Sequence, residues 1–116
     1  MTDFWTASGK PFGYLTGKNL RTLDGCHIGR LVGTEIFAPD GSYLGEVAQG
    51  HYLVIDLSKR KKRVRPFRAV APKPDLMEWA GIAPLTLAEG FEDFPSPDQI
   101  RGEQIEDLLR GYVEAD

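Results

Sequence analysis

The chain has 116 residues, of which 41% are hydrophobic and 10% aromatic, which fits one globular domain and excludes wholesale disorder. No apolar run reaches the roughly eighteen residues of a membrane span, and the N-terminus lacks the pattern of a secretory signal. We therefore expect a cytoplasmic protein without membrane contact. Cys26 is the only cysteine, which excludes an intramolecular disulfide and a multi-thiolate metal cage.

The net charge of -3 conceals three blocks of different sign. Residues 1–58 carry a net charge of -2, residues 59–74 carry +8 with no acid, and residues 75–116 carry -9. The basic block and the acidic C-terminal block are therefore able to neutralise each other.

A sixteen-residue repeat occupies the first half of the chain: FWTASGKPFGYLTGKN (4–19), LRTLDGCHIGRLVGTE (20–35) and IFAPDGSYLGEVAQGHY (36–52), the last one residue longer. Two glycine columns recur at this spacing, namely Gly9, Gly25 and Gly41, and Gly13, Gly29 and Gly45. Each unit predicts one β-hairpin plus the turn to the next, with strands of four to five residues such as 12–15, 28–31 and 44–47. One such hairpin cannot bury its apolar face, so we expect several to pack around a common core.

The glycines have two possible interpretations. Those of the first column follow Ser or Asp at tight turns, where a positive φ is needed. Those of the second column lie inside strands, where close approach of a neighbouring backbone or a bulge would explain them. The alternative is a phosphate-binding loop, but GxGxxG is absent and no predicted helix follows. We favour the structural interpretation.

A fourth unit is expected from residue 52, where YLVIDLSKRKKRVRPF suggests a longer strand, a polar turn around residues 58–61 and a return strand near residues 63–67. Its glycine columns are absent, so this unit closes the array as a modified hairpin or serves as a cap.

The segments ASGKPFGYL, LDGCHIGRL and PDGSYLGEV resemble the four-fold β-flower family, in which short hairpins form petals around a pseudo-four-fold axis. This resemblance covers about half of the chain and implies a fold, without an activity or site residues. PDGSYLGEVAQGHYLVIDL (39–57) also resembles, more weakly, the small β-barrels of PRC-barrel domains.

The second half contains six of the eight prolines between residues 66 and 97, which predicts an irregular arm with room for a short helix around residues 75–80. Its apolar residues indicate that the arm wraps over the β core or over a second subunit. Ser96-Pro97-Asp98-Gln99 is a capping box, and the spacing of the apolar residues that follow predicts a C-terminal α-helix. The fold class is thus mainly β, with a hairpin domain over residues 1–68 and an arm and helix over residues 69–116 that form no independent domain.

The most prominent candidate binding segment is SKRKKRVRPFR (58–68), whose basic residues are Lys59, Arg60, Lys61, Lys62, Arg63, Arg65 and Arg68. These cations are suited to nucleic-acid phosphates, with Phe67 stacking on a base, or to another acidic ligand. We favour the simpler interpretation, a solvated hairpin tip that pairs with the acidic C-terminal block, because the whole protein is acidic and repels polyanions at a distance.

Other candidate residues carry weaker signals. Cys26 and His27 are adjacent, and neighbours in a strand or turn point to opposite faces, so they do not suggest a nucleophile and base. Asp24, Asp40 and Asp56 recur every sixteen residues, which raises the possibility of a carboxylate cluster, although two of them belong to Asp-Gly turns. Trp5 and Trp79 either line a ligand pocket or fill a core or interface. We predict no metal site and no cofactor.

The sequence therefore favours a non-enzymatic, bacterial-type binding or assembly module that forms a homo-oligomer and has room for a protein partner. Two alternatives stay open. One is a nucleic-acid-associated protein that uses residues 59–68, and the other is a small enzyme with its site between the hairpins and the arm.

Overall fold

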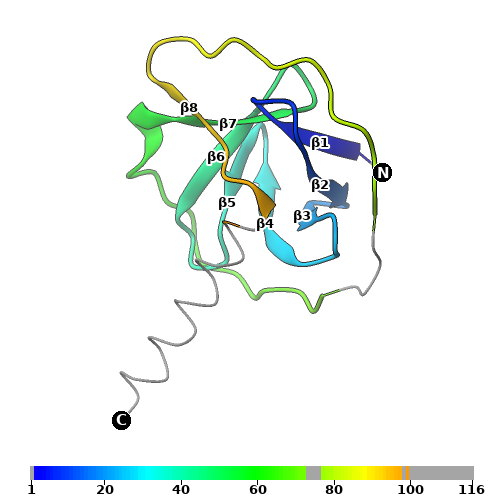
Figure 1. Cartoon of the computed structure of the whole chain (residues 1–116). Coiled ribbons are helices and arrows are strands. Elements are labelled where there is room, and N and C mark those ends of the chain that lie inside the picture. The colour runs from blue at the N-terminus through cyan, green and yellow to red at the C-terminus, as the bar shows by residue number, and fades with distance from the viewer. Residues whose placement is uncertain (1, 73–76, 98, 100–116) are drawn as a thin grey trace.

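The structure, a computed structural model, describes residues 2–72, 77–97 and 99 (Figure 1). Its eight strands are β1 (Thr2–Thr6), β2 (Pro11–Thr16), β3 (Asn19–Thr22), β4 (His27–Val32), β5 (Glu35–Phe37), β6 (Tyr43–Ala48), β7 (Tyr52–Asp56) and β8 (Phe91–Asp93). A short 3-10 helix, η1 (Leu57–Lys59), follows β7. The mainly β fold expected from the sequence is confirmed.

The first seven strands close into a barrel. Each strand pairs antiparallel with the next, and β1 closes the ring by pairing in parallel with β7 through Trp5 with Tyr52 and Thr6 with Leu53. β8 pairs with the second half of β7, from Val54 to Asp56. One edge of β7 is therefore shared by β1 and β8.

The sixteen-residue repeat appears in the strand register. Phe4 lies opposite Gly13, Leu20 opposite Gly29, and Ile36 opposite Gly45. The register shifts immediately after each of these pairs. Each repeat thus forms one bulged hairpin, as the turn residues predict.

The second glycine column marks close backbone contacts, as expected. A Cβ on Gly13 would lie 1.8 Å from the Arg21 carbonyl oxygen, and a Cβ on Gly45 would lie 2.5 Å from that of Val54. No side chain fits at such distances, because the obstacle is the backbone of the next strand.

The return strand predicted near residues 63–67 is wrong. These residues form no strand and contribute one isolated bridge, between Arg63 and Ser42. The strand that pairs with Val54–Asp56 is β8, which pairs Val54 with Asp93. The fourth hairpin is therefore split, and residues 57–90 connect its two strands.

The described parts of this connection, residues 60–72 and 77–90, are here named the belt and run around the outside of the barrel (Figure 1). Its amides donate hydrogen bonds to carbonyls spaced sixteen residues apart in the hairpin turns. The bonds are Leu85 N to Ala7 O (2.7 Å), Met77 N to Leu23 O (2.7 Å) and Phe67 N to Pro39 O (2.9 Å). Each repeat thus offers an equivalent carbonyl oxygen, and an amide of the belt donates a hydrogen bond to each of the three.

A second set of carbonyls in the turns is also bonded. Ile82 N donates to Gly9 O (2.9 Å), and Val64 N donates to Gly41 O (2.8 Å). At Gly25 the donor is the Arg21 guanidinium (2.8 Å), which also bonds Ala71 O of the belt (3.0 Å). The described parts of the belt therefore lie against the hairpin turns of the barrel.

The core joins the repeat to the residue that follows β8. Its buried residues are Phe4, Phe12, Leu20, Ile28, Ile36, Leu53 and Phe94. Six come from the hairpins at repeated positions, and Phe94 follows β8 directly. The barrel core is therefore completed by a residue from the part of the chain expected to be an arm.

Two helix predictions concern the last third of the chain. Residues 77–80 have no helix, so the described part of the expected short helix at residues 75–80 is not formed. The capping box is present, since Ser96 N donates to Gln99 Oε1 (3.0 Å) and Gln99 N donates to Ser96 Oγ (3.4 Å). The predicted C-terminal helix lies outside the described residues.

Candidate functional site

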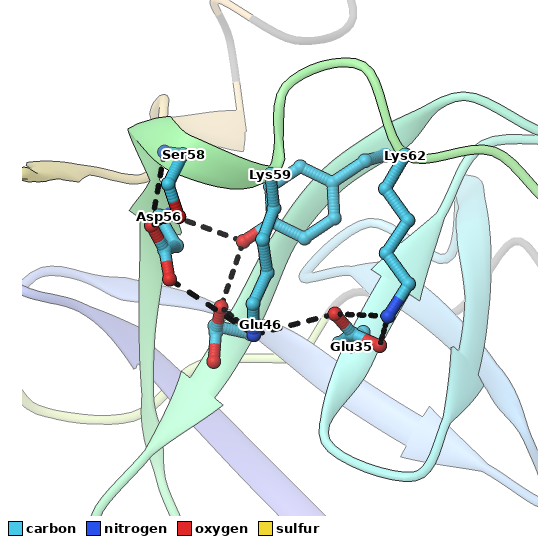
Figure 2. A network of polar contacts seen from close by, with 7 residues as sticks. Glu35, Glu46, Asp56, Ser58, Lys59 and Lys62 are labelled. Atoms are coloured by element: carbon cyan, nitrogen blue, oxygen red, sulfur yellow. Dashed lines mark hydrogen bonds and ion pairs between the residues drawn. The ribbon is translucent and has the colours of Figure 1, made fainter.

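A network of charged side chains lies where β5, β6 and β7 meet η1 (Figure 2). The Lys59 ammonium is 3.3 Å from Glu35, 3.1 Å from Glu46 and 3.9 Å from Asp56. Lys62 Nζ donates to both oxygens of Glu35, at 2.7 and 3.0 Å. Two lysines of the predicted basic segment therefore pair with three carboxylates of the barrel.

The strand register explains why a cation is needed here. Glu35 and Glu46 lie directly opposite each other on β5 and β6, and like charges in this arrangement repel. Asp56 caps η1 by accepting from Ser58 N (3.0 Å), which directs the next residue, Lys59, back over the two strands. Lys59 thereby offsets the repulsion between the glutamates.

Tyr43 anchors the buried side of this network. Its hydroxyl donates to Glu46 Oε1 (2.9 Å) and accepts from the Asp56 amide (3.0 Å). Burial is the main factor that raises the pKa of Tyr43, and the neighbouring Glu46 raises it further. The phenol therefore stays protonated.

Three other groups of the network, Lys59, Glu35 and Asp56, are also held in their ordinary charge states. Hydrogen bonding to Glu46 raises the pKa of Lys59, and hydrogen bonding to Lys62 lowers the pKa of Glu35. The Ser58 hydroxyl likewise lowers the pKa of Asp56. General acid or base catalysis works best with a group whose pKa lies near the working pH. These shifts all move away from neutrality, so the network is suited to holding strands together.

The remaining predicted basic residues fall into two groups. Arg60 pairs with Glu92 of β8 (3.2 Å), and Arg63 donates to the Asp40 carbonyl (3.3 Å). The side chains of Lys61, Arg65 and Arg68 are exposed and make no ion pair or hydrogen bond within the described part of the chain. The Arg60 contact joins the basic and acidic blocks, as expected, whereas Lys59 and Lys62 pair with acids from the first half of the chain.

Phe67 is not free on both faces to stack on a base. The Arg30 guanidinium lies 4.2 Å from the centre of its ring, and the His27 ring lies 6.3 Å away. These contacts hold Phe67 of the belt against β4.

The histidine and aspartate candidates have local partners. His27 is buried and its Nδ1 accepts from Val70 N (2.9 Å). Each repeated aspartate bonds a hydroxyl residue two positions away: Asp24 with Thr22, Asp40 with Ser42, and Asp56 with Ser58. Over residues 2–72, 77–97 and 99, no group of three or more His, Cys, Asp or Glu is arranged to hold a metal ion.

A second group of side chains gathers around Trp5, on the β1 and β7 side of the barrel. Trp79 of the belt lies 6.1 Å from Trp5, and His51 lies 5.8 Å from it at an interplanar angle of 89°. The sequence indicates the two tryptophans, and His51 as a histidine next to a turn, but it does not predict that His51 lies beside Trp5, because only the β1–β7 closure brings them together.

Comparisons of the chain with protein-family models, with curated proteins and with solved structures find no match. Within the described residues, no helix has the length and apolar character needed to cross a membrane.

Proposed function

We propose that the protein is a non-enzymatic binding or assembly module that acts as a homo-oligomer. The observation that carries this proposal is the closed ion-pair network in which Lys59 contacts Glu35 and Glu46 across two strands. Its lysine is held protonated, and Glu35 and Asp56 are held ionised, so each is poorly suited to proton transfer near neutral pH. Such a network stabilises a framework that presents its surface to a partner.

The proposed relationship to the β-flower family concerns the fold alone. A ring of hairpins requires equivalent pairings at the repeat spacing, and Phe4–Gly13, Leu20–Gly29 and Ile36–Gly45 are such pairings. A seven-strand barrel is compatible with this family and with the PRC-barrel resemblance.

Light scattering on the purified full-length chain tests the assembly proposal. We expect a mass of two or more copies of the 12.9 kDa chain over a range of protein concentrations. A strict monomer at all concentrations, combined with a failure to retain any protein partner from cell extract, would overturn the proposed function.

A second candidate function is nucleic-acid association, favoured by the exposed side chains of Lys61, Arg65 and Arg68. Each cation that contacts a phosphate releases counterions when the protein binds. Loss of three such contacts therefore makes the plot of log binding constant against log salt concentration less steep by about 2 to 3. The test compares a triple alanine variant at these positions with a control variant at two other exposed lysines, Lys10→Ala and Lys18→Ala. Equal binding by both variants, or no binding at low salt, eliminates this candidate.

A further inference from the structure

We propose that the hollow beside Trp5 binds a trimethylammonium group, carried by a small molecule or by a methylated lysine side chain. The hollow is shallow and largely open to solvent, with a volume of about 520 Å³. Its lining residues are Thr2, Asp3, Trp5, His51 and Ile82. This volume lies within the range of small-molecule sites, roughly 300 to 1,000 Å³.

The aromatic walls form a corner. The rings of Trp5 and His51 are perpendicular, at 89°, with their centroids 5.8 Å apart. A compact cation placed beside this edge-to-face pair can contact the π-system of Trp5, and tryptophan offers the strongest cation–π attraction of the aromatic side chains.

Charge favours a cation over other ligands. Asp3 is partly exposed, lines the hollow, and makes no ion pair or hydrogen bond through its carboxylate within the described residues. No lysine or arginine is among the lining residues. An anion would be repelled by Asp3, whereas a neutral apolar ligand would gain nothing from it.

The corner is held in place before any ligand binds. Trp5 Nε1 donates to Ala80 O (2.8 Å), and Trp5 N donates to His51 O (2.9 Å). The His51 ring packs on Tyr52 with centroids 4.5 Å apart, and the Tyr52 hydroxyl bonds the Ala83 carbonyl. The belt thus fixes both walls, and fixed walls reduce the entropy cost of binding.

A trimethylammonium group fits better than a metal ion or a bare ammonium. It is weakly hydrated and apolar on its surface, so it loses little on leaving water for an aromatic corner. A hard cation would need several oxygen ligands, and Asp3 is the only carboxylate lining this hollow.

The experiment is a fluorescence titration of the full-length chain. Trp5 and Trp79 are the only tryptophans and lie 6.1 Å apart, so tryptophan emission reports on this site alone. The probes are choline, a trimethyllysine peptide, and 3,3-dimethyl-1-butanol, the uncharged isostere of choline. We expect saturation by a trimethylammonium probe with a dissociation constant on the order of 1 mM, and binding of the isostere that is about tenfold weaker.

Two variants distinguish this site from a general charge effect. Asp3→Asn should weaken binding of the trimethylammonium probe about fivefold to tenfold, whereas Glu89→Gln, at an exposed carboxylate of the belt, should leave it unchanged. Tighter binding of choline indicates that a small molecule carries the trimethylammonium group. Tighter binding of the trimethyllysine peptide indicates that a protein carries it.

Three results would overturn the inference: no saturation by either charged probe, equal affinity for the isostere, or an unaltered affinity in Asp3→Asn. The inference deepens the proposed binding function and rests on it. If the fluorescence titration fails but the protein is an oligomer or retains a partner, only the trimethylammonium site is refuted. If light scattering shows a strict monomer and no partner is retained from cell extract, the proposed function itself is refuted.

Discussion

The ring of Phe94 packs against the ring of Phe12, with centroids 5.1 Å apart, although the two residues come from opposite ends of the described chain. Phe12 belongs to the first hairpin, and Phe94 follows the strand that completes the split fourth hairpin. This contact makes the barrel core depend on the residue that follows β8.

Phe94→Ala should therefore lower the free energy of unfolding by about 3 to 5 kcal/mol, because it removes a buried aromatic ring and leaves a cavity. Urea denaturation followed by circular dichroism measures the change. The control is Phe67→Ala, at a partly exposed ring of the belt, which should cost much less. A loss below about 1 kcal/mol in Phe94→Ala would show that this residue is dispensable to the core.

Gly13→Ala should disrupt the pairing of β2 with β3. Its Cβ would lie 1.8 Å from the Arg21 carbonyl oxygen, so one strand must move, at a cost of about 3 kcal/mol or more. Gly33→Ala is the control, because Gly33 has a φ of +64° and open space around it, and the cost there is about 1 kcal/mol of backbone strain. Equal losses in thermal denaturation would contradict the close approach.

Lys59→Met should lower the urea midpoint at neutral pH, because it leaves Glu35 and Glu46 opposed without their shared cation. The hydrogen bond from Lys62 and, to a lesser degree, that from Lys59 lower the pKa of Glu35 in the folded state, so these ion pairs stabilise the fold above about pH 4.5 and their contribution is lost as the pH falls through the folded-state value. The difference between variant and wild type should accordingly shrink in acid. Lys61→Met, at an exposed lysine, should change neither the urea midpoint nor its dependence on pH. If the difference in urea midpoint between Lys59→Met and wild type does not depend on pH, Lys59 has no electrostatic role.

His27 should make the fold less stable in mild acid. Burial lowers the pKa of His27 below its ordinary value of 6.5, and the charges of Arg21 and Arg30 lower it further, against a hydrogen bond at Gly29. The unfolded chain therefore takes up this proton first, so stability falls as the pH drops below 6.5. His27→Gln should flatten this part of the pH profile of urea denaturation, and an imidazole titration followed by NMR should give a pKa below 6.5. An unshifted titration would refute the effect of burial.

Amide hydrogen exchange should reveal the bonding of the belt. The amides of Val64, Phe67 and Leu85 donate to carbonyls of the hairpin turns, so they should exchange slowly despite lying outside any strand. Arg65 and Arg68, whose amides have no such bond within the described residues, serve as internal references and should exchange fast. Uniformly fast exchange would mean that the belt does not hold these turns in solution.

The repeat determines the first three hairpins by itself, because turn residues and short alternating strands act over a few neighbouring positions. Gly9, Gly25 and Gly41 have the positive φ that their turns require, and Gly13 shows the predicted close approach. The Asp-Gly turn also predicts that Asp40 bonds the nearby backbone, and its carboxylate accepts from both the amide and the hydroxyl of Ser42.

Only the tertiary structure decided how the ring closes and where the charges go. The three residues of β8 carry no repeat signal, so the expected return strand was placed at residues 63–67 although the pairing strand begins at Phe91. Lys59 belonged to a conspicuous basic segment, yet its ion pairs with Glu35 and Glu46 depend on β5, β6 and η1 meeting in space. Local sequence fixes turns, whereas pairing between distant segments depends on the closed barrel that brings them together.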